Sequence, residues 1–143
     1  MVATPAAGTG NAPWALNLDF SGDLAAHVTG TAQSDDTLHN ECTGTDSGRL
    51  GSWASTMAFT AGQRRYALVV LVTGYRGAAT FTSGLKVEVS SQDQVQVWQN
   101  GPGDQASFTV GVGETSGLIS ATLSNAAAVG HKLVITGHWS CLP

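Results

Sequence analysis

The chain has 143 residues, enough for one domain with a core of its own. Only 11% of its residues are charged, against about 25% in a typical soluble domain, so hydroxyl and amide groups supply most of its polarity. The formal net charge is −4, and the sequence has no basic cluster beyond Arg64-Arg65. This balance argues against nucleic-acid binding, because nothing attracts a phosphate backbone.

Residues 1–13 are rich in Ala, Gly, Thr and Pro and predict a flexible tether ahead of a single domain at 14–143. No positively charged region followed by an apolar stretch opens the chain. By analogy with other tethers of this composition, we expect that a signal sequence has been removed and Met1 added; the alternative is a native start. The longest apolar run, 66–72, is far shorter than the ~20 residues of a membrane helix, so we expect no membrane span.

Apolar and polar residues alternate with period two along the chain, and no helical period is convincing. At the start of the domain, Leu16, Leu18 and Phe20 fall on one face of the first expected strand. The later segments alternate in the same way. The expected strands are 15–20, 23–32, 51–60, 65–73, 85–91, 95–99, 106–112, 117–125 and 132–141, with a further short stretch at 80–82 inside a loop.

Two segments depart from simple alternation. Residues 67–72 are apolar on both faces, which is typical of a central strand covered on both sides. Residues 33–47 are polar and acidic and predict a loop. The short, even spacing of the remaining strands predicts an all-β fold, an antiparallel β-sandwich of eight to nine strands, with a small β-barrel as the second choice.

The two cysteines each lie three residues after a histidine: Cys42 after His39, and Cys141 after His138. Two histidines and two cysteines have the composition of a tetrahedral zinc site. Side chains alternate between the faces of a strand, however, so His138 and Cys141 point in opposite directions unless a bulge intervenes. We therefore predict a Cys42–Cys141 disulfide in an oxidising compartment, with the zinc site and two free thiols as alternatives.

Four acidic residues gather in the polar loop: Asp35, Asp36, Glu41 and Asp46. Calcium takes several carboxylate and carbonyl oxygens, so a calcium site is one interpretation. The spacing matches no calcium-binding loop, and a solvated acidic loop is the simpler interpretation. We expect no other cofactor.

Three aromatic residues outside the clearest core positions suggest a ligand surface: Trp14, Tyr75 and Trp98. Exposed rings give large contact areas for sugars or for a protein partner. Packing of the same rings at the edge of the sandwich is the alternative.

The sequence gives little support for catalysis. The four histidines (His27, His39, His131 and His138) form no local ligand motif. Ser52 and Ser55 flank a tryptophan, but no nucleophile elbow surrounds either of them. Paired acids for glycoside hydrolysis would be separated in sequence and recognisable only in space. We expect a protein that is not an enzyme, with a small secreted hydrolase as the alternative.

Two stretches carry a resemblance. One runs from FSGDL at 20–24 to VTG at 28–30, and the other from SGLI at 116–119 to KLVITGHWSC at 132–141. They resemble small secreted proteins and lipoproteins of actinobacteria and related bacteria, including the mycobacterial lipoprotein antigens. GYRG at 74–77 is similar to a turn of such exported domains. The resemblance implies a β-sandwich behind a tether and carries over no site residues. No cysteine that could be lipidated lies near the N-terminus.

These observations together predict a secreted or cell-surface module that binds an unknown protein or carbohydrate, or has a structural role. We expect a monomer with no nucleic-acid partner. Besides the hydrolase, the remaining alternative is a subunit that assembles into a surface layer or filament through its edge strands.

Overall fold

The computed structural model describes residues 14–34 and 52–141, and all regular structure in these two ranges is β-strand. The strands are β1 (Trp14–Gly22), β2 (Ala26–Ser34), β3 (Ser52–Ala61), β4 (Arg64–Thr73), β5 (Ala79–Phe81), β6 (Leu85–Ser91), β7 (Val97–Gln99), β8 (Ala106–Val110), β9 (Ser116–Asn125) and β10 (Lys132–Cys141). The all-β prediction is confirmed.

The strands form one antiparallel sheet that nearly closes into a barrel. Pairing runs β10-β1-β2-β3-β4-β6-β7-β9, and β9 pairs in turn with β10; β8 joins the N-terminal part of β9, and β5 joins β8. Two of these junctions are short, because β2 meets β3 only at Gln33 and Ser34 and β7 meets β9 only at Trp98 and Gln99. The short junctions flatten the nearly closed sheet into two layers.

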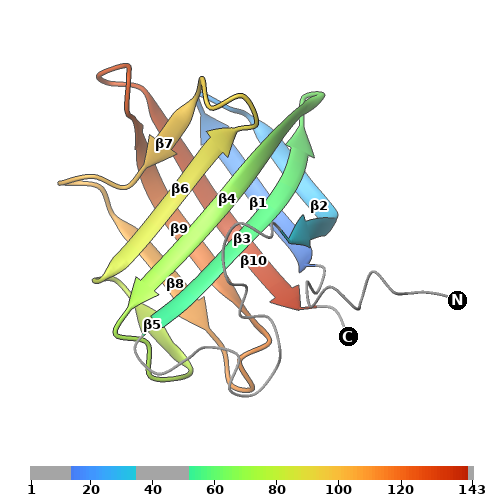
Figure 1. Ribbon diagram of the computed structural model, residues 1–143, viewed down its shortest axis with the longest axis vertical. Helices are drawn as coiled ribbons and strands as arrows, with labels where there is room; N and C mark the ends of the chain where they lie inside the picture. The colour runs from blue at the N-terminus through green and yellow to red at the C-terminus, as the bar shows by residue number, and fades with distance from the viewer. Residues whose placement is uncertain (1–13, 35–51, 142–143) are drawn as a thin grey trace, which may run out of the picture.

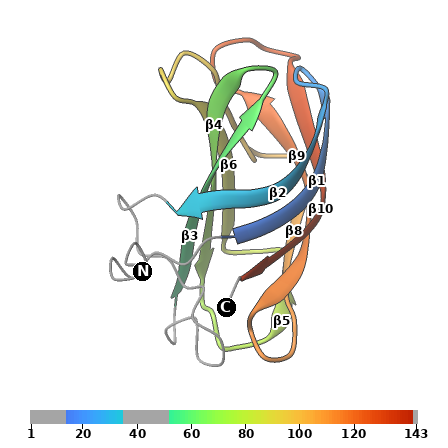
Figure 2. The ribbon, with the colours of Figure 1, turned by 90° about the vertical axis from the view of Figure 1, so that its right-hand side faces the viewer.

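The two layers are visible from the side in Figure 2. One contains β3, β4 and β6, the other contains β1, β10, β9 and β8, and β2 passes from the second layer toward β3. In Figure 1 the strands of the front layer cross those behind at a steep angle. This arrangement fits both the sandwich and the small barrel predicted from the sequence.

The described ranges contain one strand more than the nine expected. The short stretch predicted inside a loop is β5, which pairs with β8. Most strand boundaries lie within a few residues of the prediction, and β6 and β10 match it. β7 starts later than expected because the Asp93 carboxylate accepts the backbone N–H of Val95 at 3.1 Å, which extends the preceding turn.

The core between the layers is rich in aromatic rings. Phe108 stacks on Trp139 with ring centroids 5.4 Å apart, and Trp53 contacts both rings. At the other end of the core, Phe59 stacks between two more rings, those of Phe20 and Tyr66. All six are buried, each on the inner face of its strand.

One prediction about β4 is wrong in part. This strand lies centrally, between β3 and β6, and Tyr66, Leu68, Val70 and Val72 are buried on its inner face. The intervening residues 67, 69 and 71 are only half-buried. An antiparallel sheet packs a single face against the core, so apolar residues on the outer face of β4 do not require a covering layer.

Two glycines allow neighbouring strands to approach closely. A Cβ atom at Gly117 on β9 would lie 1.7 Å from the Thr109 carbonyl oxygen, and one at Gly137 on β10 would lie 2.1 Å from that of Asn17. Gly117 is also the cross-strand partner of Trp139, whose ring would contact the added atom. Glycine at these two positions lets the second layer curve around the core aromatics.

Candidate functional site

The outer face of the second layer is a continuous polar surface. Because side chains alternate along a strand and paired residues share a face, the register defines rows that cross the strands. One row consists of Thr80, Thr109, Leu118, His138, Asn17 and Thr29. The next consists of Ser107, Ser120, Thr136, Asp19 and His27. We call the surface formed by these two rows the polar face.

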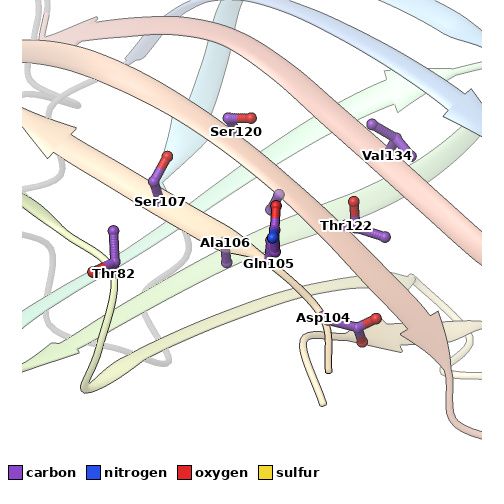
Figure 3. Close-up of a pocket in the computed structure, with 9 residues that line it drawn as sticks. Thr82, Asp104, Gln105, Ala106, Ser107, Ser120, Thr122 and Val134 are labelled. Carbon is purple, nitrogen blue, oxygen red and sulfur yellow. The ribbon is translucent and has the colours of Figure 1, made fainter. Parts of the chain in front are cut away.

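A groove of about 440 Å³ adjoins the polar face over β8, β9 and β10. Its lining combines hydroxyl and amide groups with apolar side chains and consists of Thr82, Asp104, Gln105, Ala106, Ser107, Ser120, Ala121, Thr122 and Val134. In Figure 3 most of these side chains belong to the adjacent strands β8, β9 and β10 or to the segment that leads into β8. The groove therefore offers many groups that both donate and accept hydrogen bonds, and a single carboxylate.

That carboxylate, Asp104, is held by a hydrogen-bond network. Its Oδ2 accepts hydrogen bonds from Ser124 Oγ at 2.7 Å and from the Gly101 amide at 2.9 Å. Its Oδ1 lies 2.9 Å from Lys132 Nζ, which also donates to Ser124 Oγ at 2.7 Å. The network ties the connection between β7 and β8 to β9 and β10. Lys132 Nζ is the donor in both of its contacts, to the Asp104 carboxylate and to the Ser124 hydroxyl.

The Asp104 network predicts a loss of stability in acid. Burial raises the pKa of the carboxyl group, but the donors from Ser124, Gly101 and Lys132 outweigh it and lower the pKa from 3.8 to about 2. A carboxyl whose pKa is lower in the folded state stabilises the fold above its unfolded pKa. The contribution to the free energy of unfolding is on the order of 1–2 kcal/mol, because Lys132 is half-exposed and solvent screens its charge. We expect it to disappear as the pH falls from about 4 to about 2.

Asp104→Asn tests this prediction by urea unfolding at several pH values. The variant should be less stable than the parent at pH 7 and should show a smaller decrease in unfolding free energy between pH 4 and pH 2. Asp19→Asn is the matched control, because Asp19 is exposed and faces an exposed histidine. Equal acid sensitivity of the parent and Asp104→Asn would contradict the assignment.

Two of the three aromatic residues predicted to form a ligand surface, Tyr75 and Trp98, are buried. Tyr75 is 1% exposed and Trp98 is 4% exposed, so their ring faces are packed in the core and are not available for stacking on a ligand. Tyr75 lies against Trp53 and Phe81, and its hydroxyl donates to Glu114. Trp14 begins β1 opposite Cys141, and its ligand-binding role stays a prediction.

Several other predicted site residues lie outside the described ranges. These are Cys42, His39 and the four acidic residues Asp35, Asp36, Glu41 and Asp46. Cys141 ends β10 and packs partly against the core, as the strand pattern predicts, whereas His138 is exposed on the opposite face. The described residues contain no group of three or more potential metal ligands. They also contain no helix that is both long and apolar enough to span a membrane.

Two aspartate–histidine pairs were missed by sequence reasoning. His27 contacts Asp19 directly across the β1–β2 pair, and His131 Nδ1 lies 3.0 Å from Asp23 Oδ1. The register of the β1–β2 hairpin, which places Asp19 opposite His27, could have revealed the first pair. No local sequence signal links Asp23 to His131, which lies 108 residues later in the chain. Within the described ranges, neither histidine is hydrogen-bonded to a hydroxyl or thiol side chain.

No known protein family, curated protein or solved structure matches the chain.

Proposed function

We propose that the chain is a non-enzymatic, extracytoplasmic binding module whose polar face binds a neutral saccharide. The observation that supports this proposal is the continuity of hydroxyl and amide side chains across the polar face and its groove. Each acid of this surface has a basic partner: Asp104 in the groove is paired with Lys132, and Asp19 on the polar face is paired with His27. A surface of this kind matches a ligand that carries many hydroxyl groups and no charge.

The geometry of the rows fits an extended ligand better than a compact one. Neighbouring strands lie about 4.8 Å apart, so each row presents a polar group at regular intervals across the layer. Thr80 and Thr109 already share a hydrogen bond of 2.9 Å between their hydroxyls, which fixes their orientation at one end of a row. Leu118, 57% exposed in the same row, offers an apolar contact for the C–H face of a sugar ring.

The extracytoplasmic location depends on the predicted Cys42–Cys141 disulfide and on the resemblance to exported bacterial domains. A low content of charged residues is consistent with this location. The disulfide and the resemblance bear only on the compartment. The proposed ligand is argued from the polar face alone.

The test is retention of the protein on a panel of neutral polysaccharides, followed by calorimetry with soluble fragments of any that bind. Ser120→Arg places bulk and charge in the centre of the polar face and should weaken binding at least about tenfold, because a buried unpaired charge is costly at an interface. Thr60→Arg, at an exposed position on β3 in the other layer, should bind like the parent. Absence of binding to every neutral polysaccharide, or equal binding by Ser120→Arg, would exclude the proposal.

A second candidate function, assembly into a layer or filament, is supported by the edge of β2. Among the described strands, β2 pairs with β3 only at Gln33 and Ser34, which leaves 26–32 with an open edge. Open edges are templates for pairing with another strand. Size-exclusion chromatography and electron microscopy distinguish this function, since it requires concentration-dependent oligomers and the binding module does not.

A further inference from the structure

A second cavity lies at the end of the fold where four hairpin turns meet, at the top in Figure 1. Its volume is about 400 Å³, within the range of small-molecule sites. The turns β1–β2, β6–β7 and β9–β10 and the adjoining ends of β4, β7 and β9 form its lining, which consists of Asp23, Leu24, Arg64, Tyr66, Gln96, Trp98, Asn125, Ala128 and His131. We call it the hairpin cavity. It is separate from the polar face.

The acidic group of the hairpin cavity is the Asp23 carboxylate, and both of its oxygens contact other side chains of the protein. Asp23 Oδ2 accepts a hydrogen bond of 2.9 Å from the indole Nε1 of Trp98, and Asp23 Oδ1 faces His131 Nδ1 at 3.0 Å. The Trp98 bond is the largest cause of a lowered pKa for Asp23, with burial partly opposing it and His131 adding to it. Because a carboxylate only accepts, His131 Nδ1 is the donor, and its Nε2 is left facing away from Asp23.

The groups with unused capacity in the hairpin cavity are mostly donors. Arg64 forms no hydrogen bond or ion pair shorter than 4 Å within the described part of the chain. It also borders a neighbouring cavity, where its charge acts on the Asp93 carboxyl. Gln96 Oε1 accepts from Asn125 Nδ2 at 3.0 Å, which leaves the Gln96 amide nitrogen to donate elsewhere. His131 adds a further donor at Nε2 when it is protonated.

The lining also has apolar side chains, Leu24 and Ala128, and it includes Tyr66. A guanidinium with free N–H groups pairs with a carboxylate through two parallel hydrogen bonds, which fixes both position and orientation. The apolar part of the lining then has room for a short hydrocarbon body. We propose that the hairpin cavity is a binding site for a small organic carboxylate, held by Arg64 and the Gln96 amide beside the Asp23–His131 pair.

Nuclear magnetic resonance titration with butyrate tests the site. The reporters are the Trp98 indole N–H, assigned with the variant Trp98→Phe, and the His131 ring signals. Butyrate should produce saturable shifts of both reporters, whereas butyramide, which has the same body without the charge, should produce none. Arg64→Gln should weaken butyrate binding at least about tenfold, because one charged pair with two hydrogen bonds is lost.

Two matched controls use this chain's own residues. Arg65→Gln removes the neighbouring guanidinium, which lines the adjacent cavity shared with Arg64 but not the hairpin cavity, and should leave butyrate binding unchanged. His27→Gln removes the histidine of the other aspartate–histidine pair and should also have no effect. The proposal is overturned if butyrate gives no saturable shift, if Arg64→Gln binds like the parent, or if inorganic phosphate or butyramide binds as tightly as butyrate.

Discussion

Replacing Trp53 by alanine is expected to destabilise the fold by about 3–5 kcal/mol. Trp53 is 1% exposed on β3, and its ring contacts three other aromatic rings: Tyr75 at 5.2 Å, Trp139 at 5.7 Å and Phe108 at 6.0 Å between centroids. These rings come from the other layer and from the chain after β4, so the indole joins both layers at the centre of the core. Its removal leaves a cavity that rigid neighbours cannot fill.

Urea or guanidinium unfolding, followed by far-ultraviolet circular dichroism, measures the change. Trp53→Phe is the matched variant, because it keeps an aromatic ring and removes an indole N–H that is buried without a hydrogen-bond partner among the described residues. The loss of that unsatisfied donor offsets part of the lost volume, so Trp53→Phe should cost clearly less than Trp53→Ala. A cost below about 1 kcal/mol for Trp53→Ala would show that the aromatic cluster is not packed as described.

Reduction of the predicted Cys42–Cys141 disulfide is expected to lower stability by up to about 4–5 kcal/mol. The loop that it closes has roughly 100 residues, and the chain-entropy estimate for a loop of that length is about 4.7 kcal/mol. For a domain of this size, such a change corresponds to a fall in Tm of roughly 10–20 °C. Cys141 lies at the end of β10, opposite the first residue of β1, so the bond would act where the described chain begins and ends.

Thermal unfolding with and without a reducing agent measures this effect, and mass spectrometry after alkylation counts the thiols. Cys42→Ser, Cys141→Ser and the double variant form the control series. If the two sulfur atoms are bonded, each single variant should lose about as much stability as the double variant, and reducing agent should not affect any of the three. A melt of the parent protein that is unchanged by reduction would contradict the disulfide and remove a main support for an extracytoplasmic location.

The burial of Tyr75 and Trp98 illustrates a limit of reading function from sequence. Tyr75 lies in an expected loop, and Trp98 lies near the end of the short expected strand 95–99, so an exposed ring and a core ring are equally compatible with the pattern. The tertiary structure places Tyr75 against Trp53, and gives Trp98 an acceptor in Asp23, which lies 75 residues away in the chain. A buried indole usually finds a hydrogen-bond partner, and here that partner comes from another hairpin.

The amino-acid sequence by itself determined the strands and their inward faces. Leu16, Leu18 and Phe20 are buried and the intervening residues exposed, because the alternation of side chains along a strand is a local property of the backbone. For the same reason β10 could be located in full, with His138 and Cys141 on opposite faces.

Only the tertiary structure decided which strands are neighbours and therefore which side chains meet. The rows of the polar face, the Asp104–Lys132 network and the Asp23–His131 pair all join residues brought together by the register of distant strands. Alternation leaves that register open, because many pairings bury the same inward faces. The near-closure of one sheet around a shared aromatic core selects among them, and both candidate sites are products of that selection.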